Sequence, residues 1–403
     1  MPHHVAVFMN SLMLGGAERV ILALTRALAA RRTVRVDLLL TAREGPLVAE
    51  IPDGIRVIEL GMAGAPAVWA SLLRLPWPTL RCVGPPFLLD KTPKAVRCLP
   101  RLVRFLRAER PDGLLTTLSY NNLVALWASA LAGMDTRVVV REANTLSQEA
   151  SASATTLGRR MPALAGLWYP RAAGVVAVSE GVATDLARVA CLPPERITTI
   201  HNPVDMARIA ALAEAPVAPP LDPRWFEPGQ PPVVVAVGRL APQKDYPTLL
   251  RAFARVVASR PARLLILGEG PERPALHALA SSLGITAAVE LPGAVENPFA
   301  AVRRAAVFVL SSAWEGFPNV LAEALACGCP VVSTDCPSGP AELLEGGSLG
   351  RLVPVGDDEG LAQAISATLD APQHSDRLLA RARGLSLDAA LDRYLSLLLP
   401  SAA

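Results

Sequence analysis

The sequence contains little lysine, little histidine and few aromatic residues. Arginine supplies 36 of its 39 basic residues, and Lys244 is the only lysine beyond residue 94. Only 4% of the residues are aromatic whereas 51% are hydrophobic, so the core must consist mostly of alanine, valine and leucine. No stretch approaches the ~20 consecutive apolar residues of a membrane-spanning helix. The isolated Lys244 suggests a contact that needs a compact charge, such as one to phosphate.

Targeting signals and metal motifs are also lacking. The first residues have neither the basic flank nor the long apolar core of a signal peptide, so we expect a cytoplasmic protein. The six cysteines are scattered, and Cys327 and Cys329 lack the partners and spacing of a zinc site, so we expect buried thiols and no metal. Residues 1–200 carry 23 Lys/Arg against 15 Asp/Glu, and residues 201–403 carry 16 against 21. This basic first half favours an acidic substrate or an anionic membrane surface.

Apolar runs of strand length alternate with helical patterns along the whole chain, which predicts an α/β protein with parallel sheets covered on both faces. The predicted strands are 5–10, 34–40, 114–118, 138–142 and 174–178 in the first half, and 233–238, 263–268, 289–291, 307–310 and 331–334 in the second. A proline-rich stretch at 215–232 follows the predicted boundary near residue 203. We therefore expect domains at 1–202 and 203–384, and a last helix at about 385–400.

Residues 315–340 are the most informative segment. They follow the buried strand pattern at 307–310; Pro318 suits the first position of a helix and Gly328 its end. Such a turn directs unpaired backbone N–H groups and the positive end of a helix towards the sheet edge, which suits phosphate. Glu315 lies in this turn, and Glu323 lies about two turns along the helix. A capping Glu315 with a merely solvated Glu323 is the alternative, and the length of the surrounding pattern favours function.

The order of an acid, seven residues, a second acid and the run Ala-Cys-Gly-Cys-Pro-Val-Val resembles the signature of the retaining glycosyltransferases of family 4. The resemblance implies the GT-B fold, in which two Rossmann-like, doubly wound domains face each other across a cleft. It implies that 1–202 binds the acceptor, that 203–384 binds the nucleotide sugar, and that the last helix packs back on the first domain. Glu315 would then orient the donor sugar, and Glu323 would bind the ribose.

A second motif places two cations on one loop. Arg239 and Lys244 follow the predicted strand that ends at Gly238, and the string Gly-Arg-Leu-x-x-Gln-Lys-Asp is similar to one in the same family. Two cations at the carboxyl edge of a sheet can bracket a pyrophosphate and stabilise its charge as it leaves. A solvated pair of loop residues is the alternative.

Glycines mark two further turns at predicted strand ends. Gly15 and Gly16 precede a helix and would let the backbone approach a ligand closely, although a plain tight turn would also need them. Gly268 and Gly270 open a ledge after the strand at 263–268. The resemblance places the first pair at the diphosphate or donor sugar, and the second pair at the nucleotide base.

The acceptor side departs from the family pattern. Many members carry a histidine near the start of a helix that reaches the donor sugar, whereas this chain has Ser119, Tyr120 and Asn121 at the comparable place. These three are the candidates to replace it. Arg141 and Glu142 end another predicted strand, and we weigh equally a position facing the cleft and a local salt bridge.

Segment 66–110 has a different character. Its first part is an apolar stretch broken by proline, which contains Trp69, Leu72, Leu73, Leu75 and Trp77. Its second part spaces Lys94, Arg97, Arg101, Arg104 and Arg107 three or four residues apart on one helix face, and Pro100 interrupts the pattern, which can make its first turn a separate one. A basic helix face beside tryptophan and leucine is typical of peripheral contact with an anionic membrane, and a solvated arginine face is the alternative.

The resemblance implies a hexosyltransferase that transfers a hexose or N-acetylhexosamine from a nucleotide-diphosphate sugar, most simply a UDP-sugar. It implies retention of configuration, no metal or other cofactor, and a glycan or lipid-linked acceptor in cell-envelope polysaccharide biosynthesis. We expect no nucleic-acid partner. The catalytic residues would be Arg239, Lys244 and Glu315. The donor-binding residues would be Gly15, Gly16, Gly238, Gly268, Gly270, Gly316, Phe317, Asn319, Val320 and Glu323. A sugar-nucleotide 2-epimerase on the same fold and a non-catalytic sugar-nucleotide-binding protein are the alternatives.

Overall fold

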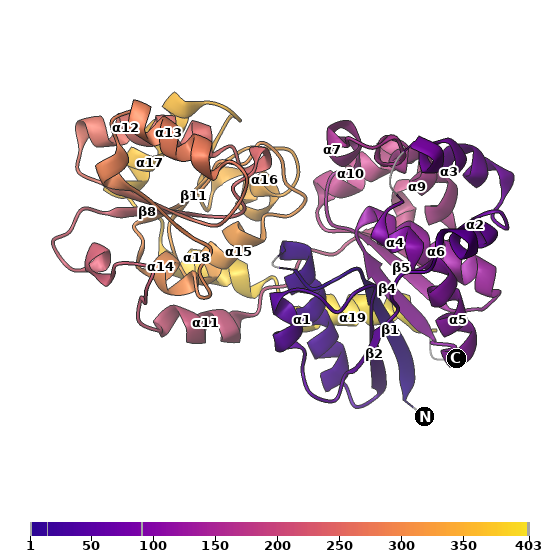
Figure 1. Cartoon of the computed structure of the whole chain (residues 1–403). Helices are drawn as coiled ribbons and strands as arrows, with labels where there is room; N and C mark the ends of the chain where they lie inside the picture. The colour runs from indigo at the N-terminus through magenta and orange to yellow at the C-terminus, as the bar shows by residue number, and fades with distance from the viewer. Residues whose placement is uncertain (1, 14, 90–91, 401–403) are drawn as a thin grey trace. The chain divides into compact units, whose positions relative to one another are not determined.

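The computed structural model describes residues 2–13, 15–89 and 92–400, and its chain divides into two compact units (Figure 1). Unit 1 comprises Met1–Pro203 and Leu387–Ala403, and unit 2 comprises Val204–Ser386. Each unit has a parallel sheet with helices packed on it, which confirms the predicted α/β fold class.

Unit 1 contains a seven-stranded parallel sheet. Its strands, in spatial order, are β3 (Arg56–Glu59), β2 (Val34–Leu40), β1 (His3–Met9), β4 (Gly113–Thr117), β5 (Arg137–Glu142), β6 (Gly174–Ala177) and β7 (Ile197–Thr199). The chain places β2 and β3 on one side of β1 and then crosses to β4 on the other. The carboxyl ends of β1 and β4 therefore flank a topological switch point, the usual place for a ligand in such sheets.

Helices cover both faces of this sheet. They are α1 (Gly16–Ala30), α2 (Ala65–Leu72), α3 (Trp77–Leu89), α4 (Lys94–Arg97), α5 (Leu99–Glu109), α6 (Ser119–Ala132), α7 (Leu146–Ala152), α8 (Thr156–Arg159), α9 (Met161–Trp168), α10 (Glu180–Val189) and α19 (Leu387–Leu398), with 3₁₀ turns at Pro46–Glu50, Tyr169–Arg171 and Pro194–Arg196. Alternate residues of β1 point to opposite faces. Val5 and Val7 join the core beneath α1 and α19, and Ala6 and Phe8 join the core beneath α5 and α6.

The last helix, α19, completes the first of these cores, and its Leu398 is fully buried. Two strand glycines make room for it. A Cβ on Gly113 would lie 2.7 Å from the Leu398 carbonyl oxygen, and one on Gly174 would lie 3.1 Å from the Leu397 side chain. The carboxyl-terminal residues are therefore part of the core of unit 1.

Unit 2 contains a six-stranded parallel sheet. Its strands, in spatial order, are β10 (Val289–Gly293), β9 (Arg263–Leu267), β8 (Val233–Val237), β11 (Val307–Leu310), β12 (Val331–Thr334) and β13 (Arg351–Val353). Its helices are α11 (Met206–Glu214), α12 (Tyr246–Ser259), α13 (Arg273–Ser282), α14 (Phe299–Arg304), α15 (Asn319–Ala326), α16 (Pro340–Leu343), α17 (Asp358–Asp370) and α18 (Ser375–Arg383), with 3₁₀ turns at Pro223–Phe226, Pro242–Lys244, Thr286–Ala288 and Glu345–Gly347. Here the switch point lies between β8 and β11.

All ten predicted strands are present, and the structure adds three that the sequence did not predict, namely β3, β7 and β13. Each of the three lies at the edge of its sheet. They are three or four residues long and mostly exposed or half-buried, so they have no continuous apolar run. Strands of this kind give little sequence signal because only one neighbour pairs with them.

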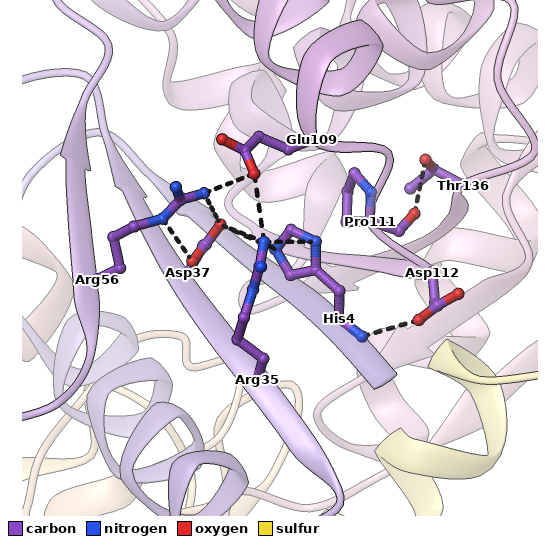
Figure 2. A network of polar contacts seen from close by, with 8 residues as sticks. All are labelled: His4, Arg35, Asp37, Arg56, Glu109, Pro111, Asp112 and Thr136. Atoms are coloured by element: carbon purple, nitrogen blue, oxygen red, sulfur yellow. Dashed lines mark hydrogen bonds and ion pairs between the residues drawn. The ribbon is translucent and has the colours of Figure 1, made fainter. Parts of the chain in front are cut away.

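A buried carboxylate on β2 binds side chains near the amino ends of β1 and β3 (Figure 2). Asp37 on β2 is fully buried and lies 2.8 Å from the Nε2 atom of His4 on β1. It also accepts a 3.0 Å hydrogen bond from the Nε atom of Arg56 on β3. Glu109 at the end of α5 pairs with Arg56 at 2.9 Å and with Arg35 at 3.2 Å. This network lies at the end of the sheet opposite the switch point, so we assign it to stability.

The basic residues of segment 66–110 do not share one helix face, contrary to their spacing. Lys94 and Arg97 lie on α4, and the other three lie on the separate helix α5, which begins at Leu99 and carries Pro100 in its first turn, as the interruption at Pro100 predicts. Arg101 donates to the Leu60 carbonyl at 2.8 Å, and Arg107 donates to the Leu131 carbonyl at 2.7 Å. Lys94 pairs with Glu44 at 3.5 Å, so at least three of the five cations have partners within unit 1. Residues 90 and 91 of this segment lie outside the described residues.

Candidate functional site

The structure brings Lys244 and Glu315 together at the switch point of unit 2. Lys244 ends the 3₁₀ turn after β8, and Glu315 lies in the loop after β11. The Lys244 Nζ atom lies 2.6 Å from the Glu315 Oε1 atom, and the two side chains are only 15% and 7% exposed. These residues are 71 positions apart in the sequence, and the parallel pairing of β8 with β11 places them side by side.

Hydrogen bonds between the same two loops support this ion pair. The Ser312 hydroxyl donates to Glu315 Oε1 at 2.6 Å, and the Ser311 hydroxyl donates to the Lys244 carbonyl at 2.7 Å. The Gln243 side chain donates to the Trp314 carbonyl at 3.0 Å. The Lys244 ammonium is thus held in place before a ligand arrives, which lowers the entropy cost of binding an anion there. Gln243 is the glutamine of the Gly-Arg-Leu-x-x-Gln-Lys-Asp string, whereas no motif in the sequence pointed to Ser311 or Ser312.

The negative charge of Glu315 affects its neighbours. Burial and, to a smaller extent, the nearby Glu315 carboxylate raise the pKa of the Cys336 thiol to about 12. Burial and the same carboxylate also raise the pKa of Tyr246. Both groups therefore stay neutral at physiological pH. Among these four neighbouring residues, Lys244 and Glu315 are the charged ones.

Helix α15 begins at Asn319, with Pro318 at the preceding capping position, so the helix starts one residue later than its predicted first position. Gly328 follows it in the left-handed conformation (φ +66°) that ends the helix as predicted. Gly316 and Phe317 are buried, and Asn319, Val320 and Glu323 are half-buried. Glu323 therefore remains accessible to a ligand from the side of the helix.

Gly268 and Gly270, which the sequence predicts at the nucleotide base, allow two neighbouring loops to pack closely. A Cβ on Gly268 would lie 1.8 Å from the Gly238 carbonyl oxygen, and one on Gly270 would lie 2.2 Å from the Leu240 carbonyl oxygen. Both distances are far below a normal contact, so the loops after β8 and β9 can meet only if these positions are glycine. Whatever they bind, these glycines also shape the loop that carries Arg239, whose side chain is exposed.

Glu269, between these two glycines, has a structural partner. It pairs with Arg273 one helical turn later at 2.7 Å, and Arg273 also donates to the Leu291 carbonyl at 2.6 Å. The arginine therefore ties the loop after β9 to β10.

In unit 1, Gly15 and Gly16 lie at the carboxyl end of β1, where α1 begins. Gly15 is the capping residue of α1, and a Cβ there would lie 2.1 Å from a carboxylate oxygen of Glu18. Because this oxygen ends a flexible side chain that can move aside, the packing does not by itself require glycine at position 15.

The three candidates to replace the family histidine have different surroundings. Ser119 is buried and lies 3.1 Å from the Glu142 carboxylate. The hydroxyl of Tyr120, which is half-buried, lies 3.3 Å from the Thr155 hydroxyl. Asn121 is fully buried and donates to the Thr117 carbonyl at 2.9 Å. Ser119 and Tyr120 thus lie nearer the surface of this edge than Asn121 does.

Arg141 and Glu142 point to opposite faces of β5, so the structure favours separate roles over a local salt bridge. Within the described residues, the Arg141 guanidinium contacts Thr117 and Asn202, with 2.8 Å to the Thr117 hydroxyl. The buried Glu142 contacts Tyr169 and Ser119 instead. Sequence reasoning did not identify Tyr169 or the nearby Glu149, because α7 and the turn after α9 bring them in from other parts of the chain.

The fold consists of two Rossmann-like units, each with a cluster of polar residues at its switch point, and comparison with known families gives the class of the protein. Residues 14–208 match the family described as Glycosyltransferase Family 4, and residues 231–371 match the one described as Glycosyl transferases group 1. The chain belongs to the family 4 glycosyltransferases, and it is therefore an enzyme, a hexosyltransferase.

One similar protein is N-acetylgalactosamine-N,N'-diacetylbacillosaminyl-diphospho-undecaprenol 4-alpha-N-acetylgalactosaminyltransferase from Campylobacter jejuni. It is 30% identical over 368 residues, which cover 91% of this chain and 90% of the relative. The lipopolysaccharide core biosynthesis glycosyltransferase LpsE of Rhizobium meliloti is 34% identical over 207 residues, which cover 50% of this chain and 57% of LpsE.

Solved structures confirm the GT-B fold. HepE from Anabaena, in complex with UDP-glucose, superimposes with a TM-score of 0.74 at 19% identity and covers 98% of this chain and 99% of its own. The lipopolysaccharide outer core galactosyltransferase WaaB gives a TM-score of 0.69 at 18% identity, with 98% of each chain covered. At this level of identity the likeness establishes the fold.

Proposed function

We propose that this enzyme transfers a hexose or N-acetylhexosamine from a nucleotide-diphosphate sugar, most simply a UDP-sugar, to a glycan or lipid-linked acceptor. The observation that carries the proposal is the Lys244–Glu315 pair at the switch point of unit 2, beside the start of α15. An ammonium, the exposed Arg239 and a helix N-terminus form a set of positive groups suited to a departing diphosphate.

The same contacts indicate how Glu315 would act. Its Oε1 atom accepts from Lys244 and Ser312, both at 2.6 Å. A carboxylate held by a cation and a hydroxyl is a poor nucleophile, so we infer that it orients the donor sugar. Attack on the same face as the leaving group would then retain the anomeric configuration, and the leaving phosphate oxygen would take the proton of the acceptor. Glu323, half-buried and further along α15, would bind the ribose.

The names of two relatives indicate the kind of acceptor that this enzyme would use. The Campylobacter protein is named for an undecaprenol-diphosphate acceptor, and LpsE for lipopolysaccharide core biosynthesis. We therefore place the enzyme in the assembly of a cell-envelope polysaccharide on a lipid carrier, with the acceptor bound by unit 1 and the donor by unit 2.

A lipid-linked acceptor would be met at a membrane surface. None of the helices within residues 2–13, 15–89 and 92–400 combines the length and apolar character needed to cross a membrane. Leu73 and Trp77, at the junction of α2 and α3, are 65% and 70% exposed. The exposed Arg74 and Arg81 lie close to them in the sequence. We infer that this junction, rather than the arginines of α5, contacts an anionic membrane on the cytoplasmic side.

A donor screen tests the proposed reaction. Purified enzyme is incubated with UDP- and GDP-sugars and with lipid-linked acceptors, with and without EDTA, and the products are analysed by mass spectrometry and NMR. The proposal expects a glycosylated acceptor with retained configuration, at equal rates with and without chelator. Release of a C2-epimerised sugar would establish the epimerase alternative, and donor binding without turnover would establish a non-catalytic binding protein.

Liposome flotation tests the membrane contact separately. We expect binding to vesicles that contain phosphatidylglycerol and much weaker binding to neutral phosphatidylcholine vesicles. Equal binding to both kinds of vesicle, or binding to neither, would contradict a contact made by the basic and apolar residues of the α2–α3 junction.

A further inference from the structure

Glu142 is a buried carboxyl group with an unusual set of partners. It ends β5 and is only 1% exposed. Its Oε1 atom accepts from the Tyr169 hydroxyl and from the Asn122 amide, the latter at 3.0 Å. Its Oε2 atom faces the Ser119 hydroxyl at 3.1 Å. All three partners are hydroxyl or amide groups, so none of them brings a positive charge to this buried carboxyl group.

Ser119 lies between two acidic groups, and it has only one proton to donate. Its hydroxyl lies 3.1 Å from Glu142 Oε2 and 3.0 Å from Glu149 Oε2. If both carboxyl groups were ionised, one of these contacts would place two lone pairs against each other. Both become hydrogen bonds if one carboxyl group donates to the serine and the serine donates to the other.

The surroundings decide which group keeps the proton. Glu149 is half-buried and accepts a 2.6 Å hydrogen bond from the Asn144 amide, which suits an anion. Glu142 is enclosed, and Arg141, its neighbour on β5, extends to the other face of the strand. A buried carboxyl group without an adjacent cation is most stable when it is neutral. The proton therefore belongs to Glu142 and the negative charge to Glu149.

The charged groups on the neighbouring elements agree with this assignment. Burial and the Glu149 carboxylate raise the pKa of Glu142 to about 7, against the lowering effect of its hydrogen bonds. The pKa of Tyr169, in the turn after α9, is raised by burial and by Glu142, so its hydroxyl stays protonated. On α10, Asp185 accepts from the Ser147 backbone and pairs with Arg188 at 2.6 Å, so this pair adds little net charge.

We propose that Glu142 is a positioning residue that works by holding a proton, and that its neutral form fixes Ser119 and Glu149 at the carboxyl edge of the unit 1 sheet. This inference rests on the proposed function, in which that edge binds the acceptor. When Glu142 loses its proton, Ser119 faces two carboxylates and can satisfy only one of them. Glu149 and α7, which carries it, then lose their attachment to the start of α6. Acceptor binding weakens as a result, while donor binding on unit 2 does not change.

Infrared difference spectroscopy tests the proton directly and needs no substrate. In the wild type we expect a protonated-carboxyl C=O band at pH 6 that fades with a midpoint near pH 7. Glu142→Gln should remove this band, because the amide copies the hydrogen bonds of the acid without a titrating group. Glu149→Gln removes the charge that opposes ionisation, so its midpoint should shift to lower pH. Glu195→Gln, at an exposed site on unit 1, should match the wild type.

The pH dependence of acceptor KM tests the positioning role. In the wild type, KM should rise above pH 7, approaching about tenfold per pH unit, whereas Glu142→Gln should give a flat profile. A wild-type protein with no carboxyl band at pH 6, or a band that survives Glu142→Gln, overturns the proton assignment. A flat wild-type profile, or a rising profile in Glu142→Gln, overturns the positioning role. If no sugar is transferred to any acceptor, the proposed function fails. The spectroscopic titration uses no sugar, so it still tests whether Glu142 holds a proton.

Discussion

Replacement of Asp37 by asparagine should destabilise unit 1 strongly. The carboxylate is fully buried, receives the Arg56 guanidinium and His4, and thereby connects three strands (Figure 2). Removing one partner of a buried ion pair costs about 3–5 kcal/mol when the other partner stays buried. Arg35 and Arg56 are 52% and 47% exposed, so water can solvate them after the change. We therefore expect a loss of about 2–3 kcal/mol in the free energy of unfolding.

The pH dependence gives this prediction a second test. Burial alone would raise the pKa of Asp37, but hydrogen bonds from Arg56 and His4 outweigh it, so its pKa lies below the usual value of 3.8. The stabilisation is then fully present above that value and is lost as the pH falls through the lower, folded-state pKa. The difference between wild type and Asp37→Asn should therefore shrink as the pH falls below about pH 4.

Urea unfolding followed by circular dichroism measures both quantities. Asp53→Asn, an exposed aspartate in a turn of the same unit, is the matched control and should change stability by less than about 0.5 kcal/mol. If Asp37→Asn unfolds at the same urea concentration as the wild type, or if the difference does not change at about pH 3.5, the network does not stabilise unit 1 as inferred here.

Three further predictions concern the proposed function. Lys244→Ala should lower kcat/KM for the donor by about 10²–10³. The control Arg255→Ala, which removes an exposed cation from unit 2, should stay within about twofold of the wild type. If Lys244→Ala has the same kcat/KM as the wild type, Lys244 does not stabilise the diphosphate. Glu323→Ala should raise the donor KM about tenfold with little change in kcat, because a ribose contact is the same in ground and transition states, and an unchanged KM would show that the ribose assignment is wrong. Trp77→Ala should reduce flotation with anionic vesicles about tenfold, whereas Val355→Ala, an exposed apolar residue on unit 2, should have no effect.

The sequence predicted those features that lie within one strand–turn–helix unit. The buried strand at 307–310, the end of α15 at Gly328 and the place of Glu315 all follow from local pattern and spacing. It also predicted that Lys244 and Glu315 serve the same ligand, because the turns after parallel strands meet at one edge of the sheet.

What the sequence could not predict depends on pairing across elements. Arg107 belongs to a regular basic pattern, yet its guanidinium binds a backbone carbonyl, and nothing in the spacing distinguishes it from a solvated residue. Glu149 lies 30 positions from Ser119 in an ordinary polar stretch, and only the packing of α7 brings them together. Gly268 looked like a ligand contact, but the loop beside it also requires a glycine there.

The place of α19 has a consequence for how the chain folds. The buried residues of α19 complete a core whose remaining members come from the first 200 residues, and Gly113 and Gly174 on the strands leave space for this helix. Unit 2 is a continuous segment and can form its core as soon as residue 386 has left the ribosome. Unit 1 also needs α19, so during synthesis the part of its sheet that α19 covers stays exposed until residue 398 has left the ribosome. The domain that begins first in the sequence is therefore the one that folds last.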